Sequence, residues 1–236
     1  MSYKRVLLKL SGEALKENDP SIFNTKKLAL VGDMIAELAK TTQVCVVIGA
    51  GNIWRGRIAE EVGLERVPAD FMGMLGTVIN GVAVSSYLNK KGIKTVVTSA
   101  VPAIDGVTIS YDKELADQAM NDGKVVFLSG GTGKPFFTTD TAAAMRAIDL
   151  NCDAILMGKN GVDGVYTGDP RVDKDAKFMA NITYEQMIDM QLKVIDDTAV
   201  DLLKTTDIDV RIFNMDDINN FIRVANGEHL GTILSK

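Results

Sequence analysis

The sequence is poor in the residues that build nucleophilic and zinc sites. Its 236 residues include one histidine and two cysteines. His229 lies in a turn-like segment, so no Ser-His-Asp or Cys-His arrangement and no histidine zinc site can be assembled. Cys45 and Cys152 lie in or beside apolar runs, which indicates buried, reduced thiols without a disulfide. Hydrolytic triads and zinc chemistry are therefore not expected.

Long apolar runs and an excess of positive charge are also missing. No apolar stretch approaches the roughly 20 residues that span a bilayer, and the charged segment 3–10 lacks the apolar centre of a signal peptide. We therefore expect a cytoplasmic protein without a membrane partner. The net charge of −5 argues against a nucleic acid polymer as partner. Nucleotides stay open, because a few local cations suffice to bind them.

Hydrophobic residues make up 46% of the chain, enough for a substantial core. No run rich in proline, serine or one charge marks a linker, so we expect a single domain over residues 1–236. Strand-like runs alternate with helical patterns: strands at 6–10, 44–48, 94–98, 125–128 and 154–157, helices at 26–40, 70–90, 113–121 and 141–150. This alternation predicts an α/β fold, a three-layer αβα sandwich with a mostly parallel central sheet.

The pattern changes after position 158. Residues 161–170 alternate turn residues with a short apolar centre, which is typical of a hairpin or of a loop over a site. Helices are expected near 184–191, 197–204 and 218–226, and strands at 210–213 and 231–234. This part is interpreted as a second half of the same sheet.

The helix predicted at 70–90 is apolar nearly all round and rich in small residues. A helix without a polar face must be buried on every side. Two interpretations have equal weight: a central core helix, or a helix in a subunit interface.

The most informative stretch is 129–140, which places glycines, threonines and a carboxylate between an apolar strand and a helix. Asp140 stands where an N-cap is expected. A carboxylate there suggests a group that organises a cation, either a lysine or a metal ion. A Walker A loop is excluded, because it would need a glycine at Leu128 and a hydroxyl at Pro135. The remaining alternative is a glycine-rich turn without a ligand.

Three glycine-bearing turns follow predicted parallel strands, at 9–12, 49–52 and 130–133. Ligands of open α/β sheets bind beyond the carboxyl ends of the strands, so these turns should converge on one site. A dinucleotide fingerprint is poorly supported, since Trp54 replaces its last glycine. Lys9 and Arg55, with backbone N–H groups and a magnesium ion, would equip the site for phosphoryl transfer.

The motifs that carry a family resemblance run the whole length of the chain. They are Lys9-Leu10-Ser11-Gly12-Glu13-Ala14-Leu15, Gly49-Ala50-Gly51-Asn52 with Arg55, Asp70 with Met72-Gly73-Met74, Gly131-Thr132-Gly133-Lys134-Pro135-Phe136-Phe137-Thr138-Thr139-Asp140, Val162-Asp163-Gly164-Val165-Tyr166 with Asp169-Pro170, and Arg211-Ile212-Phe213-Asn214-Met215. With them the chain resembles the bacterial UMP kinases of the amino acid kinase family. The block that ends in Asp140 is specific to these enzymes within the wider fold family.

The resemblance implies transfer of the γ-phosphoryl group of ATP to UMP, without a covalent intermediate, in pyrimidine nucleotide (CTP) biosynthesis. It implies Mg²⁺ with ATP as cofactor, no metal site built by the protein alone, allosteric regulation and a homohexamer to which the apolar helix contributes contacts. The implied catalytic residues are Lys9, Arg55 and Asp140, with Asp140 orienting the lysine. The implied ATP-binding residues are Lys9, Leu10, Ser11, Gly12, Gly51, Arg55, Asn160, Tyr166 and Asp169. The implied UMP-binding residues are Ala50, Asp70 (for the ribose hydroxyls), Thr132, Gly133, Lys134, Pro135, Phe136, Phe137, Thr138 and Thr139.

The sequence departs from the family pattern in three places. Ala50 replaces a glycine, which matters little if only its N–H is used. Residues 159–161 differ from the threonine and lysine of relatives, so the ATP contacts of this loop are open. Segment 17–23 lacks the glycine-phenylalanine-glycine stretch linked to GTP activation, so we expect weak or absent activation by GTP. Inhibition by UTP remains compatible with the sequence.

Two alternatives to this function remain. One is a kinase of the same fold that acts on carbamate, an amino acid or an isoprenoid phosphate, which would not need Asp70 or the Thr138-Thr139 pair. The other is a nucleotide-sensing or storage protein that binds ATP without transfer. The retention of both Lys9 and Asp140 argues against the second.

Overall fold

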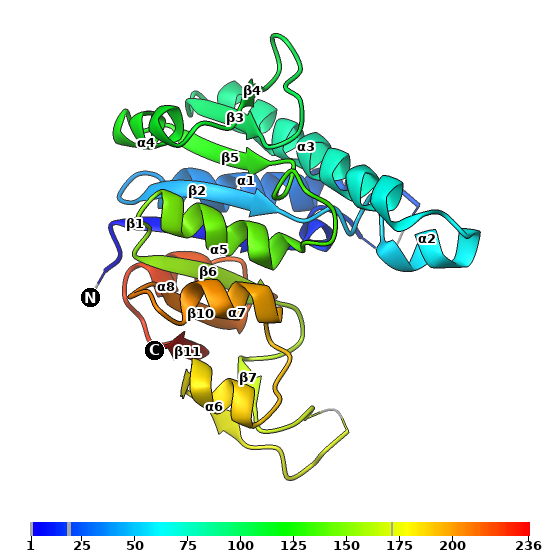
Figure 1. Ribbon diagram of the computed structural model, residues 1–236. Coiled ribbons are helices and arrows are strands. Elements are labelled where there is room, and N and C mark those ends of the chain that lie inside the picture. Colours follow the sequence, from blue (N-terminus) through cyan, green and yellow to red (C-terminus); the bar gives the residue numbers. More distant parts are fainter. Residues whose placement is uncertain (1, 18–19, 171) are drawn as a thin grey trace.

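The computed structural model describes residues 2–17, 20–170 and 172–236. Its centre is a sheet of nine described strands in the order β4-β3-β5-β2-β1-β6-β10-β11-β9, which runs from top to bottom in Figure 1. The strands are β1 (Arg5–Leu10), β2 (Gln43–Ile48), β3 (Thr95–Ser99), β4 (Ile109–Ser110), β5 (Val125–Ser129), β6 (Ala154–Lys159), β9 (Asn181–Thr183), β10 (Asp209–Asn214) and β11 (Thr232–Ser235). Within this sheet, the described strands pair in parallel except for β10 with β11.

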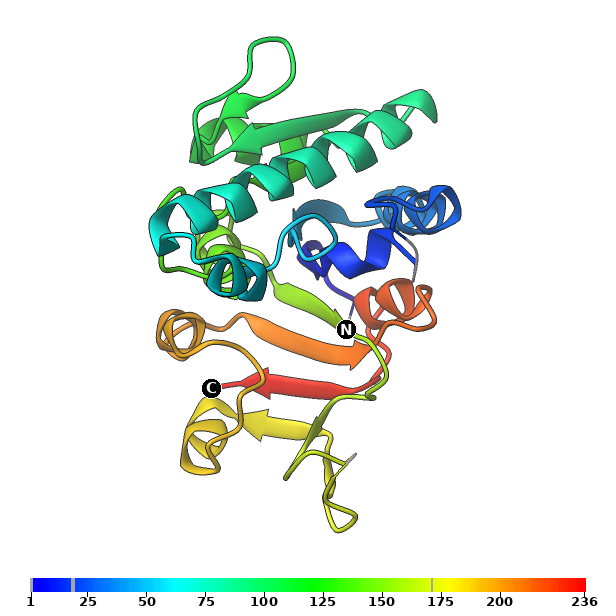
Figure 2. The same cartoon turned by 90° about the vertical axis from the view of Figure 1, so that its right-hand side faces the viewer.

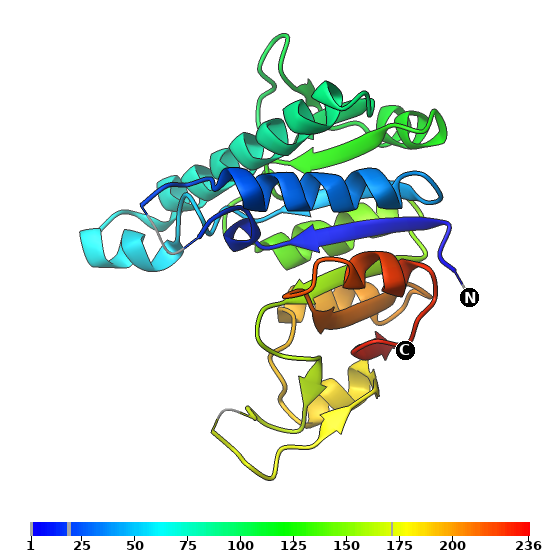
Figure 3. The same ribbon diagram turned by 180° about the vertical axis from the view of Figure 1, so that it is seen from behind.

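Helices cover both faces of this sheet, as the edge-on view in Figure 2 shows. One face carries α1 (Thr25–Leu38), α3 (Arg66–Lys90) and α8 (Asn220–Ala225), which are seen from behind in Figure 3. The other face carries α4 (Lys113–Asn121), α5 (Thr139–Asp149), α6 (Tyr184–Asp189) and α7 (Asp197–Leu203). The predicted αβα sandwich with a mostly parallel sheet is therefore confirmed.

The remaining short elements lie at the ends of the strands. The 3₁₀ helix η1 (Gly12–Leu15) follows β1, and α2 (Gly56–Val62) lies between β2 and α3. Strands β7 (Val165–Tyr166) and β8 (Phe178–Met179) pair antiparallel as a small second sheet. The hairpin expected within 161–170 is thus real, but its second strand lies further along the chain.

The long helix α3 corrects three expectations. It begins at Arg66 rather than at position 70, because Pro68 falls in the first turn, where its missing N–H costs nothing. It is not buried on every side: one face packs on α1 and the sheet, whereas Phe71, Met72, Leu75 and Ile79 are exposed. The sequence analysis expected no apolar stretch long enough to span a bilayer, but α3 is long and apolar enough to do so by length and composition alone. Packing within the chain accounts for the apolar residues of its buried face only.

The start of α5 also differs from the prediction. Thr138 is the N-cap, and its hydroxyl accepts hydrogen bonds from the backbone N–H groups of Asp140 and Thr141. The predicted capping role of Asp140 is wrong, because a capping hydroxyl two residues earlier starts the helix sooner. Asp140 lies instead in the first turn. Its carboxylate still faces the positive end of the helix dipole and is free to contact another group.

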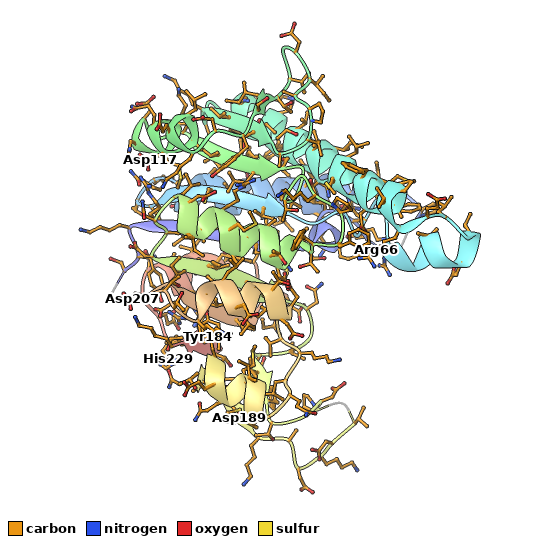
Figure 4. All side chains as sticks on the ribbon, in the orientation of Figure 1. Arg66, Asp117, Tyr184, Asp189, Asp207 and His229 are labelled. Atoms are coloured by element: carbon orange, nitrogen blue, oxygen red, sulfur yellow. The ribbon has the colours of Figure 1, made fainter. Side chains whose placement is uncertain are left out.

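The two thiols lie in the core of the α5 and α7 face, as expected. Cys45 on β2 and Cys152 before β6 are buried, and their sulfur atoms are 3.8 Å apart without a bond. His229 makes one contact, from Nε2 to the carbonyl oxygen of Ala180 at 3.5 Å. Figure 4 shows His229 on the opposite side of the molecule from Arg66, which lies at the start of α3.

Candidate active site

The turns after β1 and β2 touch each other at the carboxyl edge of the sheet. The N–H of Gly49 donates to the carbonyl of Leu10 at 2.9 Å. A Cβ on Gly12 would lie 2.4 Å from the carbonyl oxygen of Gly49 and 2.2 Å from the side chain of Asn52. Only glycine allows this approach, so the predicted convergence of these turns is confirmed and has a steric cause.

A buried amide pair holds the second turn in place. The side chain of Asn80, on α3, donates to the carbonyl of Gly49 at 2.8 Å and to Oδ1 of Asn52 at 2.8 Å. Asn52 donates back to Asn80 at 3.0 Å and to the carbonyl of Ile22 at 2.9 Å. Asn80 was missed, although an asparagine in an otherwise apolar helix is a recognisable signal, and here it is fully buried.

The third glycine turn is fixed by α3 and β3. Thr77 on α3 accepts a hydrogen bond from the N–H of Gly130 at 2.8 Å. Gly133 has a φ of 76°, and a Cβ there would lie 2.5 Å from the carbonyl oxygen of Ala100. These contacts fix the position of the loop, and the residues after it approach α3, where the N–H of Phe136 donates to Asp70.

Lys9 and Asp140 form the central ion pair of this edge. The ammonium of Lys9, on β1, lies 2.5 Å from Oδ1 of Asp140 on α5, and both side chains are largely buried at 15% and 17% exposure. Among the described residues, Lys9 is the only ion-pair partner of this carboxylate. The expectation that Asp140 positions Lys9 agrees with this geometry.

Arg55 reaches the same edge from the loop after β2. Its guanidinium contacts Oε1 of Glu13 at 2.6 Å and donates to the carbonyl of Gly51 at 3.2 Å. Glu13, in η1, was not among the predicted site residues. It holds Arg55 beside Gly51, where the sequence predicts phosphate contacts.

A first cavity, of about 190 Å³, opens between α3 and the loop before α5. Seven predicted UMP-binding residues line it: Ala50, Asp70, Thr132, Lys134, Phe137, Thr138 and Thr139. Trp54, Met74 and Thr77 complete its wall. Asp70 is held by Arg66, at 2.8 Å, and accepts the backbone N–H of Phe136 at 2.7 Å.

Three predicted UMP-binding residues do not line this cavity. Gly133 and Pro135 lie in the turn behind it, and the ring of Phe136 is 64% exposed. Phe136 adopts a φ of 71°, which is strained for a residue with a side chain. In this conformation its backbone N–H donates to Asp70, a residue that lines the cavity. Phe136 therefore acts on the cavity through its main chain and not through its ring.

A second cavity, of about 710 Å³, lies over the β7 hairpin and the segment before α7. The predicted ATP-binding residues Tyr166 and Asp169 line it, whereas Asn160 does not. The Tyr166 ring packs edge-on against Phe178 at 5.5 Å between centroids. Leu10 is fully buried in the core, which leaves its backbone for contact with a nucleotide. Ser11 caps η1 with its hydroxyl.

Two further residues near the cavities, Lys159 and Asp196, were not predicted as site residues. Lys159, at the end of β6, lines the second cavity and donates to the carbonyl of Val194 at 3.2 Å. Burial, followed by the nearby charge of Lys9, lowers the pKa of Lys159 below its ordinary value. Asp196 caps α7 and accepts the hydroxyl of Thr138 at 2.5 Å. For Lys159, the signal in the sequence was a lysine at the end of an apolar strand, similar to the position of Lys9 near the end of β1.

Known proteins match the chain over almost its whole length. The model of the amino acid kinase family matches residues 4–214. The uridylate kinase of Mycoplasma capricolum is 44% identical over 234 residues, which are 98% of this chain and 98% of that protein. The UMP kinase of Ureaplasma parvum superposes with a TM-score of 0.94 at 39% identity and full coverage of both chains. The UMP kinase of Bacillus anthracis superposes with a TM-score of 0.96 at 38% identity, covering 100% of this chain and 97% of the other.

Proposed function

The chain belongs to the amino acid kinase family, and we propose that it transfers the γ-phosphoryl group of ATP to UMP by direct in-line displacement. It is an enzyme that phosphorylates UMP with ATP, as its uridylate kinase and UMP kinase relatives indicate. The observation that carries the proposal is the Lys9–Asp140 ion pair, whose two residues are neighbours of residues that line the two cavities. Asp140 follows Thr139 of the first cavity, and Lys9 lies on the strand next to that of Lys159 in the second.

UMP occupies the first cavity in this proposal. Asp70 accepts hydrogen bonds from the ribose hydroxyls, and the segment from Thr132 to Thr139 surrounds the uridylate. The fixed position of Asp70 supports this role, because both of its oxygens are already oriented by Arg66 and by the N–H of Phe136. ATP occupies the second cavity, with its adenosine near Tyr166 and Asp169 and its phosphates pointing to the sheet edge.

The reaction needs no nucleophile from the protein. An ionised phosphate oxygen of UMP attacks the γ-phosphorus of ATP, a new P–O bond forms, and the bond to the bridging oxygen breaks with its electron pair leaving on ADP. Catalysis then consists of positioning and of neutralising charge. Lys9, oriented by Asp140, and Arg55, held by Glu13, supply positive charge beside the transferred group.

Magnesium enters this proposal as the ion of MgATP. Mg²⁺ is held mainly by phosphate oxygens and water, with one or two carboxylates, and it would neutralise charge on the phosphates. Within residues 2–17, 20–170 and 172–236 no group of three or more metal-ligating side chains occurs. The carboxylates of Asp140 and Glu13 at the edge are already paired with Lys9 and Arg55, which fits an ion carried by the nucleotide.

We also propose one domain over residues 1–236, a cytoplasmic location and a homohexamer with allosteric regulation. The continuous sheet supports the single domain. The exposed apolar side chains of α3 support an interface between subunits, and sedimentation equilibrium would measure the assembly directly. A monomer at micromolar concentration would contradict it.

The assay that tests the function measures ADP release from MgATP with UMP, CMP, dUMP, AMP, carbamate and glutamate as separate acceptors. Release confined to UMP supports the proposal. Release with carbamate or glutamate would point to another kinase of the family, and ATP binding without any release would point to a sensing protein.

A further inference from the structure

Arg211, on β10, is a buried cation that the structure leaves without a counterion. The residue is 3% exposed, and among the described residues no carboxylate forms an ion pair with it. The carbonyl oxygen of Glu228 accepts a hydrogen bond from its Nη2 at 3.0 Å, but the carboxylate of Glu228 pairs with Arg223 instead. A buried charge without a partner is costly, and it is stabilised when an opposite charge binds beside it.

The guanidinium of Arg211 also has donors that no described group uses. An arginine presents five N–H donors. Nη1 donates to the hydroxyl of Tyr3 at 3.0 Å and Nη2 to Glu228, whereas Nε is buried without a hydrogen-bond partner. Buried polar groups are nearly always satisfied, so this nitrogen is an exception that needs an explanation. Arg211 begins the last of the sequence motifs, 211–215, and the proposed function gives it no role.

Arg211 lines a third cavity, of about 570 Å³. The wall of this cavity includes residues at the starts of three parallel strands, namely Lys4 before β1, Asp153 before β6 and Asp209 in β10. His229 also lines it, and Figure 4 shows His229 on the side of the molecule opposite Arg66. None of its lining residues lines either cavity of the candidate active site. The third cavity is therefore a separate site at the amino edge of the sheet.

The charged groups of this cavity are not paired with one another. Lys4 is exposed and forms no ion pair with any described residue. Asp153 accepts the backbone N–H groups of Lys4 and Arg5 at 2.7 and 2.9 Å, and Asp209 accepts the hydroxyl of Tyr3 at 2.8 Å. The carboxylates thus have donors already, whereas the two cations have no anion. The group that is missing is an anion, and two cations favour one that carries two negative charges.

We propose that the third cavity binds a phosphate monoester with hydroxyl groups, such as a sugar phosphate. Its phosphate dianion contacts the guanidinium of Arg211 and the ammonium of Lys4, which supply a planar set of donors and a compact charge. Its hydroxyl groups donate to the carboxylates of Asp153 and Asp209. A cavity of about 570 Å³ has the size of a small-molecule site and exceeds what a phosphate group alone needs. The proposed phosphoryl transfer does not require this second ligand.

The test titrates ribose 5-phosphate into the wild-type protein in a calorimeter. This probe carries both a phosphate monoester and hydroxyl groups. It should bind at least about 10-fold more tightly than ribose, which lacks the phosphate, and than glutamate, which offers carboxylates instead. Trp54, the only tryptophan of the chain, lines the first cavity. Its fluorescence therefore reports binding there and should stay unchanged during the titration.

Two substitutions assign the binding to the third cavity. Arg211→Lys keeps the positive charge but removes the Nε donor, and it should weaken the binding of ribose 5-phosphate on the order of 10-fold. Lys4→Gln, at an exposed position, should weaken it on the order of 5-fold. Lys90→Gln is the matched control, because Lys90 is also exposed and does not line this cavity. If Arg211→Lys does not fold, Lys4→Gln and Lys90→Gln decide the comparison.

Four results would overturn the proposal. The first is a wild-type protein that does not bind ribose 5-phosphate, and the second is equal affinity in the wild type, Lys4→Gln and every folded Arg211 variant. Binding that changes the fluorescence of Trp54 and persists in these variants would place the ligand in the first cavity. Glutamate that binds as tightly as ribose 5-phosphate would show that the cavity does not select a phosphate monoester. ADP release with UMP is a separate measurement, and its failure would leave these outcomes unaffected.

Discussion

The ammonium of Lys9 and the carboxylate of Asp140 lie 2.5 Å apart, and they join the carboxyl end of β1 to the first turn of α5. Both side chains are mostly shielded from water, so the Coulomb attraction between them is stronger than at an exposed surface. The pair fixes the position of one positive charge at the carboxyl edge of the sheet.

Replacing Asp140 by asparagine should lower kcat on the order of 100-fold, because Lys9 loses the charge that orients it. The fold should survive, since Thr138 and not Asp140 caps α5. Initial rates with both substrates saturating measure the effect, and a thermal melt serves as control. A variant with normal kcat, or one that unfolds, would show that the ion pair is structural.

The substitution Asp70→Ala should raise KM for UMP on the order of 10-fold and change KM for ATP much less, because it removes acceptors for the ribose hydroxyls. The control is Arg66→Met, which removes the ion pair of Asp70 but leaves its carboxylate. The control should have the smaller effect. Equal increases in both KM values for Asp70→Ala would contradict the assignment.

Asn80→Ala should destabilise the protein by about 3 kcal/mol, since it leaves the Gly49 carbonyl and the Asn52 amide buried without partners. For a chain of this size the melting temperature should fall by about 6–12 °C. Asn89→Ala, at an exposed position of the same helix, is the control and should cost much less. A melting temperature that is equal in both variants would contradict the role of the amide pair.

The stability of the protein should fall as the pH rises above roughly 8.5, the ordinary pKa of a cysteine. Burial, followed by the hydrogen bond with Cys152, raises the pKa of Cys45 well above its usual range. The native thiol therefore keeps a proton that the unfolded chain loses, so the free energy of unfolding decreases by up to about 1.4 kcal/mol per pH unit. Urea unfolding at about pH 8 and about pH 9.5 measures this, below the range in which the buried tyrosines contribute.

Cys45→Ala is the matched variant for that experiment. It should show a shallower decline over the same interval, because the thiol that differs between the native and unfolded states is gone. An identical slope in the two proteins would exclude Cys45 as the source of the dependence.

GTP should cause little or no increase in the rate of ADP release with UMP. The segment 17–23 lacks the glycine-phenylalanine-glycine stretch of relatives that GTP activates. Positions 18 and 19 of this segment lie outside the described residues, so the prediction rests on the sequence. A several-fold activation at subsaturating UMP would contradict it, with CTP as the control nucleotide.

Much of the fold could be predicted because its signals are local. The helix at 113–121 was predicted with the bounds that the structure has, since its apolar positions repeat at the helical period and Asp112 caps it. The start of α3 was missed because its first turn contains Pro68, a residue that ordinarily interrupts a helical pattern. The second strand of the hairpin, β8, was missed because two residues are too few to produce an alternating pattern.

The longer strands and helices and the glycine turns at the strand ends could be predicted from the sequence alone. The sequence also identified Lys9 and Asp140 as candidates, because hydrophobic period, glycine spacing and the family motifs are properties of neighbouring residues. The tertiary structure was needed to show that Thr138 caps α5, that Asn80 holds the Gly49 turn, and that Lys159 donates to the carbonyl of Val194. Those relationships join residues from separate strands and helices, and they depend on sheet register and helix packing, which no local pattern encodes.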